Sequence, residues 1–155
     1  MNDPLRASEW LARGLAREGL GVEGATLLRL HAVREARGFL TVGESGRELP
    51  FVPKRFFVIS GVPREDIRGE HAHRTLQQLL ACLAGSVVVD VDDARTRRTV
   101  ILDSPEAALH LAPMTWASQH QYTVDAVLLV LASEAYDPAD YIREYGDYAA
   151  RRRRA

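Results

Sequence analysis

The sequence predicts an all-β protein, a sandwich or barrel of short strands that ends in a short helix. Two observations lead to this prediction. Short apolar or alternating segments follow one another from residue 26 to residue 131, and most of them end at Gly, Pro, Asp or Ser. Many short strands at this spacing are typical of sandwiches and barrels. The expected strands are Thr26–Val33, Phe39–Val42, Lys54–Ser60, Glu70–His73, Gln77–Leu83, Ser86–Val91, Thr99–Leu102, Ala107–Leu111 and Val124–Leu131.

The composition is that of a globular domain, because 46% of the residues are hydrophobic and 26% are charged. A length of 155 residues suits one domain with its own core. The formal net charge of -1 gives no overall field that would attract nucleic acid or a membrane surface. No secretory signal is visible, and the longest apolar run, Ala126–Ala132, is too short to span a bilayer. We therefore expect a cytoplasmic protein that binds neither nucleic acid nor membranes.

Residues 1–24 are expected to form an extension before the β-domain. Ser8 is a suitable N-cap, and apolar residues on one stripe predict a short helix within Ser8–Leu20. Glycines within and after this segment weaken or end the helix. The β-domain is then expected to span residues 25–150.

The C-terminal end predicts a second short helix. Asp137 forms a cap, and Pro138 follows at the first helical position. Aromatic and apolar residues then recur at helical spacing, which indicates packing against the β-domain; they are Tyr141, Ile142, Tyr145 and Tyr148. Residues 151–155 are expected to form a solvated basic tail, because no aromatic residues accompany the arginines for stacking on bases.

The segment from Arg68 to His73 holds the residues that are best suited to chemistry. His71 and His73 are two positions apart, so in a strand both side chains project from one face. Two neighbouring imidazoles suit either metal binding or proton transfer near neutral pH. The alternative is a pair of histidines that are exposed or satisfied in the core.

The spacing resembles the first cupin motif, in which a His-x-His pair is followed by an acidic metal ligand and a glycine. Gln78 stands in the place of the acidic ligand, and Gly85 stands in the place of the glycine. Ser118 stands where the second cupin motif would supply another histidine, and His120 is out of step. Two imidazoles and an amide are a poor ligand set for a divalent metal. We therefore expect no metal and no other cofactor.

The flanking segments make the resemblance more specific. They are Leu49-Pro50-Phe51, Lys54-Arg55, Arg68-Gly69 with His71-Ala72-His73, Val130–Ser133, and Tyr136-Asp137 with Asp140-Tyr141-Ile142-Arg143. This ordered series resembles the nucleotide-sugar 3,4-ketoisomerases, including the WxcM-like C-terminal domains, over residues 37–148. The resemblance implies a cupin jelly-roll barrel that forms homodimers. It also implies a dTDP-linked 4-keto-6-deoxyhexose substrate, whose keto group moves between C4 and C3 in deoxyaminosugar biosynthesis.

The resemblance also implies roles for individual residues. His71 and His73 would be the catalytic acid and base, and Arg68 would stabilise the enediolate or hold the pyrophosphate. Which histidine removes the proton is left open by the sequence. The expected contacts to the substrate are made by Arg37, Lys54, Arg55, Gln78, Trp116 and His120.

Two positions depart from the family pattern and keep other functions open. Phe57 stands where family members often have tyrosine, and Ala117 stands where many have histidine. Both changes remove groups that could donate or accept a proton. The alternatives are an epimerase acting on a similar dTDP-sugar, a metal-dependent cupin enzyme, and a barrel that binds a sugar nucleotide without catalysis.

Overall fold

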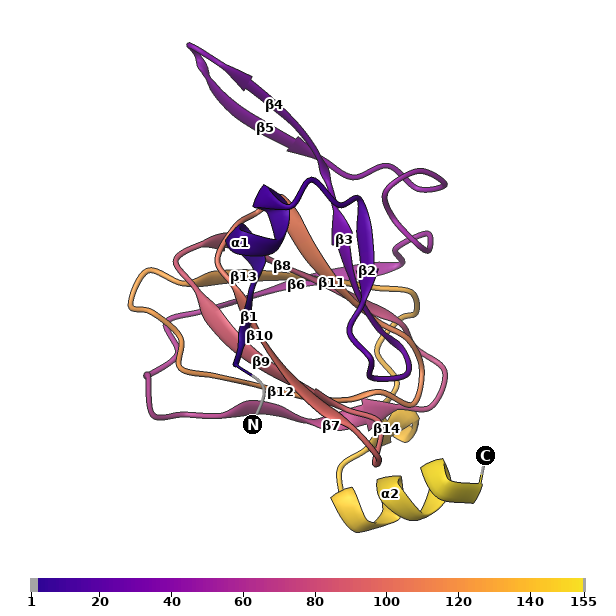
Figure 1. The fold of residues 1–155 in the computed structure, drawn as a ribbon. Helices are drawn as coiled ribbons and strands as arrows, with labels where there is room; N and C mark the ends of the chain where they lie inside the picture. Colours follow the sequence, from indigo (N-terminus) through magenta and orange to yellow (C-terminus); the bar gives the residue numbers. More distant parts are fainter. Residues whose placement is uncertain (1–2, 155) are drawn as a thin grey trace.

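The computed structural model describes residues 3–154, which form two facing β-sheets, a projecting hairpin and short helices (Figure 1). The first sheet contains, in spatial order, β1 (Leu5–Arg6), β10 (Arg97–Leu102), β9 (Val87–Asp92), β12 (Trp116–His120), β7 (Arg68–His73) and β14 (Tyr141–Ile142). The second sheet contains β2 (Arg17–Gly19), β3 (Ala25–Arg29), β11 (Ala107–Leu111), β8 (Gln78–Ala84), β13 (Val127–Ala132) and β6 (Arg55–Ser60). The hairpin consists of β4 (His31–Glu35) and β5 (Gly38–Val42), and the helices are α1 (Ala7–Ala12), the 3-10 turn η1 (Pro138–Asp140) and α2 (Tyr145–Arg154).

The two sheets enclose the main hydrophobic core. On β9, Val87, Val89 and Val91 are fully buried, whereas the alternate residues are only partly buried. This period of two places one face of the strand against the opposite sheet. Leu80 and Leu109 meet these valines from the second sheet and are also fully buried. The prediction of an all-β jelly-roll barrel with a C-terminal helix is confirmed.

The N-terminal residues pack against the barrel, with some differences from the predicted helix. The helix α1 ends at Ala12, and residues 17–19 form β2, so the helix predicted within Ser8–Leu20 is shorter than expected. Ser8 does not cap the helix, because its backbone N–H and its hydroxyl both donate to Asp103. Trp10 is fully buried in the main core. Residues 5–19 therefore contribute to the same core as the sheets.

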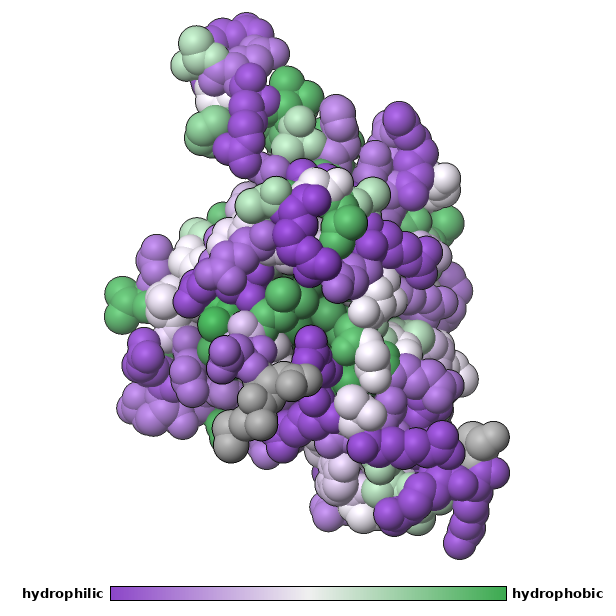
Figure 2. Space-filling view, in the orientation of Figure 1, coloured by the Kyte–Doolittle hydropathy of each residue, from purple (hydrophilic) through white to green (hydrophobic). Residues whose placement is uncertain are grey.

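The predicted strand Thr26–Val33 is divided in the structure, because the chain leaves the barrel at Leu30. β3 pairs with β11 as far as Ala107, where β11 begins two residues after Pro105. Proline has no N–H with which to extend the pairing. Beyond Leu30, β4 pairs only with β5, and the hairpin projects from the barrel (Figure 1). Hydrophobic side chains lie along this hairpin among hydrophilic ones (Figure 2).

The strand β12 was missed by the sequence prediction. Its residues, Trp116–His120, include serine, glutamine and histidine, so apolar and polar residues do not alternate. The strand is nevertheless in the middle of its sheet, because it pairs with both β9 and β7. Tertiary pairing outweighs local preference here.

The C-terminal helix begins later and ends later than predicted. The Asp137 side chain accepts a hydrogen bond from the Ala139 N–H, but it caps only the 3-10 turn η1. Tyr141 then pairs with β7 as part of β14, and α2 starts at Tyr145. The arginines predicted as a solvated tail continue α2, and Arg152 forms an ion pair with Glu23. No helix among residues 3–154 is long and apolar enough to cross a membrane.

Candidate active site

A β-bulge in β7 places two predicted site residues in one cavity. Gly69 and Glu70 have φ values of 80° and 55°, and the pairing with β12 shifts register at this point. In a regular strand, Arg68 and His71 would face opposite sides of the sheet. The extra residue reverses this, and both line the same cavity, together with Gln78. Gly69 suits the bulge because a Cβ there would lie 3.0 Å from the Ala117 carbonyl oxygen.

The cavity lies at the barrel mouth between β6, β7 and β14. Its volume is about 290 Å³, and a small recess of about 10 Å³ adjoins it toward the barrel interior. His71, Gln78 and Gln119 line both spaces. His73 lines only the small recess, and Arg55 lines only the larger cavity. A ligand in the larger cavity can therefore contact His71, whereas His73 lines only the recess.

His73 is buried and held by a carboxylate. Its side chain is 6% exposed, and its Nδ1 lies 3.2 Å from an Asp140 carboxylate oxygen. Asp140 also accepts hydrogen bonds from the hydroxyl and N–H of Thr75 and from the Leu76 N–H. Because a carboxylate can only accept, the neutral His73 carries its proton on Nδ1. Its Nε2 lies 3.4 Å from the Gln78 side-chain nitrogen, which can donate to it.

His71 is oriented by the backbone and keeps one free nitrogen. Its Nδ1 donates to the Gly69 carbonyl oxygen at 2.9 Å, since a carbonyl can only accept. The proton of neutral His71 is therefore on Nδ1, and the Nε2 lone pair is available to a substrate. No hydrogen bond to this Nε2 is found among the residues that the structure describes.

Both histidines are neutral at pH 7. Burial lowers the pKa of His71, although the hydrogen bond to Gly69 acts in the opposite direction. For His73, burial and the neighbouring His71 lower the pKa to about 4, despite the opposing effect of Asp140. A neutral imidazole can accept a proton, so the pair meets the first requirement of a general base.

Arginine and aromatic side chains surround the entrance. The Arg55 guanidinium lies 4.7 Å from the centre of the Phe57 ring and 5.2 Å from that of Tyr136. The Tyr141 ring lies 4.8 Å from the His71 ring and 4.4 Å from the His73 ring. The Arg143 guanidinium stacks on Tyr141 at 4.3 Å. With Arg68, the cavity thus offers positive charge to an anionic ligand.

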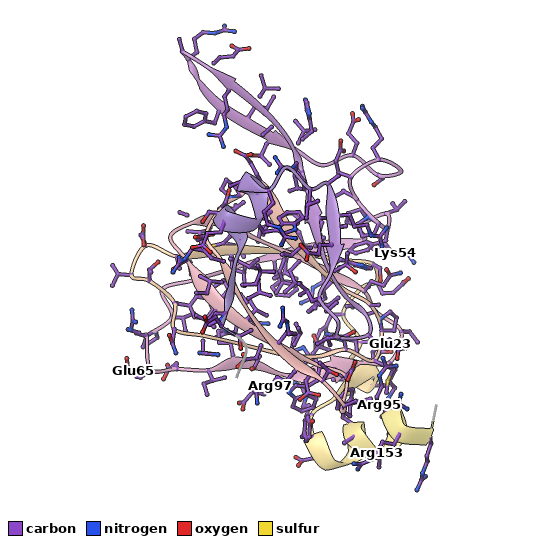
Figure 3. The ribbon with its side chains drawn as sticks, in the orientation of Figure 1. Glu23, Lys54, Glu65, Arg95, Arg97 and Arg153 are labelled. Carbon is purple, nitrogen blue, oxygen red and sulfur yellow. The ribbon has the colours of Figure 1, made fainter. Side chains whose placement is uncertain are left out.

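The structure brings together five of the nine predicted site residues. They are Arg55, Arg68, His71, His73 and Gln78. The other four lie elsewhere on this chain. Trp116 lines a separate pocket on the outer face of the sheet, and His120 bonds Asp90 at 3.0 Å. Lys54 forms an exposed ion pair with Glu134 (Figure 3). Arg37, in the hairpin turn, has an 89% exposed side chain and pairs with Glu35.

Four residues of the site had no role assigned from the sequence alone. Gln119 was missed together with its strand, β12. Tyr141 was interpreted as part of a helical packing stripe, and Asp140 and Arg143 appeared only as parts of a family motif. Side chains two positions apart on a strand share a face, so recognising β12 as a strand would have placed Gln119 on the same face as Ala117.

The described residues of the cavity offer few possible ligands for a metal ion. Among residues 3–154 no group of three or more His, Cys, Asp or Glu side chains is arranged to hold a metal ion. Ala117 pairs with His71 across the sheet and offers no donor atom. The expectation of a reaction without metal or other cofactor stays a prediction.

Together these features define a cupin-type barrel with a pair of neutral histidines, of which His71 lines the cavity and His73 the adjoining recess. Residues 23–153 match the family model FdtA, described as WxcM-like, C-terminal. The chain belongs to this WxcM-like family.

Its relatives include characterised sugar-nucleotide enzymes. TDP-4-oxo-6-deoxy-alpha-D-glucose-3,4-oxoisomerase from Aneurinibacillus thermoaerophilus is 38% identical over 122 residues, which are 79% of this chain and 88% of that protein. The 3,4-ketoisomerase QdtA from Thermoanaerobacterium thermosaccharolyticum, solved with TDP, has a TM-score of 0.83 and 34% identity, with coverage of 85% and 96%. WlaRB, a TDP-quinovose 3,4-ketoisomerase from Campylobacter jejuni, has a TM-score of 0.80 and 33% identity, with coverage of 83% and 99%.

Proposed function

We propose that the protein is a 3,4-ketoisomerase that moves the keto group of a dTDP-linked 4-keto-6-deoxyhexose from C4 to C3. The observation that carries this proposal is the free Nε2 of a neutral His71 in a cavity with Arg55 and Arg68. A related QdtA mutant was solved with TDP-4-keto-6-deoxyglucose. That enzyme is 33% identical to this chain, and the match covers 86% of this chain.

The reaction exchanges a proton at C3 for a proton at C4. The neighbouring ketone acidifies the C3 proton, and the His71 Nε2 removes it. The electron pair moves to the C4 oxygen, which is protonated to give an enediol. The C3 hydroxyl then loses its proton as the C3 carbonyl forms, and C4 receives a proton. The atoms balance without an oxidant or reductant.

The roles of the two histidines differ in this proposal. His71 is the base, because it lines the larger cavity and its Nε2 is free. His73 is more deeply buried, and its Nε2 faces Gln78. Because its pKa is about 4, His73 can carry a proton only transiently, with Asp140 beside it. It also helps to fix the position of His71, since the centres of the two rings lie 4.8 Å apart.

The arginines provide the positive charge that the substrate needs. The enediolate develops negative charge on oxygen, and stabilising such charge is often the largest single contribution to catalysis. Arg68 projects into the cavity beside His71 because of the bulge, so we assign it to the enediolate. Arg55, at the mouth, is then available to the pyrophosphate, for which a guanidinium is well suited.

We also propose a homodimer, in which the hairpin β4–β5 of each copy lies against the other barrel. Strand β6 is an edge of its sheet, and Phe56 and Val58 on its outward face are 69% and 50% exposed. Phe39 on the hairpin is 78% exposed. Unpaired edges with apolar side chains favour such pairing. This assembly would also carry Arg37 to the partner's barrel, where its predicted contact to substrate could be made. A monomer at micromolar concentration in light scattering would contradict it.

The reaction itself can be tested with dTDP-4-keto-6-deoxyglucose. We expect ¹H NMR to show conversion to the 3-keto isomer when the purified protein is added. A 4-keto product inverted at another carbon would identify an epimerase instead. Binding of dTDP with no change in the sugar would support a barrel that only binds the nucleotide.

A further inference from the structure

The sheet that carries the histidines has another cavity, on its outer face. Its volume is about 360 Å³, within the range of small-molecule sites. The polar residues that line it are Glu70 of β7, Asp90 and Asp92 of β9, Arg97 of β10 and Ser118 of β12. Ala117 and Gln119, the neighbours of Ser118, line the recess at His73 instead. The two cavities are therefore separate and share the sheet as a wall. We call this space the outer pocket.

The outer pocket contains three carboxylates and one arginine, so it keeps a net negative charge. Asp90 is paired with Arg97 at 2.8 Å and with His120 at 3.0 Å. Glu70 and Asp92 form no ion pair within the part of the chain that the structure describes. Among residues 3–154, the Asp92 carboxylate accepts hydrogen bonds from the Tyr145 hydroxyl, at 3.0 Å, and from a backbone N–H of its own turn, and from no other group. Two carboxylates thus remain for a cation.

A nearly buried serine supports a ligand at the same place. Ser118 is 8% exposed and lines the pocket. Within residues 3–154 its hydroxyl has no hydrogen-bond partner and keeps some accessible surface, so it opens into the pocket. This hydroxyl can donate to or accept from a ligand that enters the pocket.

Aromatic rings complete the lining. Trp116 and Tyr145 are packed edge to face, with ring centres 5.2 Å apart and an angle of 89° between the planes. An indole face attracts a cation, and it also packs against the C–H groups of a ring. Carboxylates, a hydroxyl and an aromatic wall are the groups that an ammonium ion with hydroxyl substituents requires.

We propose that the outer pocket is a second ligand site, which binds a small organic ammonium ion bearing hydroxyl groups. Its ammonium group lies between Glu70 and Asp92, and a hydroxyl bonds Ser118. Trp116 packs against the carbon skeleton. The site does not depend on the sugar-nucleotide reaction, because its lining residues do not reach the cavity at His71.

The test uses D-glucosamine as the probe. The chain has two tryptophans, and Trp10 is fully buried, so the two indole N–H signals in a ¹H–¹⁵N spectrum separate the pocket from the core. Trp116→Phe identifies the Trp116 signal. We expect that signal to shift with glucosamine in a saturable way, in the millimolar range, while the Trp10 signal stays in place.

The controls ask whether the charge is recognised. N-acetyl-D-glucosamine has a similar ring but no ammonium group, and we expect little shift with it. Glu70→Gln removes one carboxylate without loss of any hydrogen bond that the structure contains. It should weaken glucosamine binding roughly tenfold or more, the scale of a charge-assisted contact. Glu65→Gln changes the net charge equally and should have no effect on binding. Glu65 is exposed on a loop, away from Arg97, which lines the outer pocket (Figure 3).

The result can also overturn the proposal. A Trp116 signal that does not respond to glucosamine means that the pocket is not such a site. Equal shifts with both sugars show that the ring stacks on the indole without recognition of charge. Equal affinities in Glu70→Gln and Glu65→Gln show that Glu70 is not a contact. Each of these outcomes contradicts the proposal.

Discussion

Two histidines in the same sheet bond an aspartate, yet only one of them, His73, lines the recess that adjoins the active-site cavity. His73 and Asp140 have side chains that are 6% and 10% exposed. His120 and Asp90 are 21% and 14% exposed, and Asp90 lines the pocket on the outer face of the sheet. Asp90 also accepts hydrogen bonds from Arg97 and Thr99. Asp140 instead bonds Thr75 and Leu76, and so serves the turn that follows His73.

The difference shows that a histidine–carboxylate pair does not define a catalytic site. What distinguishes the inner face is a second histidine with a free nitrogen, an adjoining cavity and positive charge at its entrance. His71 provides the first of these, and Arg55 and Arg68 provide the last. The outer pair has an arginine that neutralises its carboxylate instead. Replacements on the two faces should therefore have very different consequences.

The largest difference is expected between His71→Asn and His120→Asn. Loss of the base should reduce kcat by at least about a hundredfold, the scale of general acid–base catalysis. His120→Asn should stay within a factor of about two, because His120 does not line the cavity and surface changes usually have small effects. Steady-state rates with dTDP-4-keto-6-deoxyglucose measure both. Similar losses of kcat in the two variants would contradict the proposed difference between the two faces of the sheet.

The next effect concerns the arginine that the bulge turns inward. Arg68→Ala should lower kcat by about tenfold or more, because one charge-assisted contact to the enediolate is lost. The dissociation constant of dTDP should change less. Arg64→Ala, at an exposed loop position, is the matched control and should leave both quantities unchanged. If Arg68→Ala weakened dTDP binding more than it lowered kcat, Arg68 would hold the pyrophosphate.

The two aspartates should differ in their effect on stability. Asp140→Asn replaces one of the two acceptor oxygens with an NH₂ group, which then faces the N–H of Thr75 or of Leu76. Because this donor cannot accept their hydrogen bonds, the free energy of unfolding should fall by about 1–3 kcal/mol. Asp90→Asn should cost less than about 1 kcal/mol, because its pairs are more exposed. Urea denaturation of the two variants compares them. A larger loss for Asp90→Asn would contradict this ranking.

The smallest expected effect is a shift in the pH profile. Burial lowers the pKa of His71, so the neutral base persists to lower pH than in a solvent-exposed histidine. The acid limb of kcat/KM should therefore lie below about pH 6.5, the value for an unperturbed histidine. Activity should be retained above this limb and lost as the pH falls through it. A limb at higher pH than that of a free histidine would show that His71 is not held neutral by burial.

The sequence predicted the parts of the fold in which local pattern and tertiary contacts agree. In β9, fully buried and partly buried residues alternate, and the valines and aspartates of its sequence allowed the strand to be predicted. β12 has no such alternation, and only its pairing on both sides makes it a strand. Tyr141 and Tyr145 are spaced as in a helix, but in the structure Tyr141 belongs to strand β14 and Tyr145 begins helix α2.

The site could be predicted only to the level of single residues. The His71/His73 pair follows from the period of two in a strand. The position of Arg68 depends on the bulge, which the sequence marks only by Gly69. Trp116 and His120 were assigned to the substrate on the family resemblance. Because β12 was not recognised, the face of the sheet that they occupy was unknown. The contact of Tyr141 with both histidines is a long-range contact that no local pattern encodes.

The central claim is that His71 removes the C3 proton of the sugar. The most direct measurement is ¹H NMR of dTDP-4-keto-6-deoxyglucose with the protein in D₂O. We predict that isomerisation leaves deuterium at C4 of the product and, by reversal, at C3 of the remaining substrate. His71→Asn should show neither exchange, although it still binds dTDP. Exchange at C3 at the wild-type rate in His71→Asn would contradict the account.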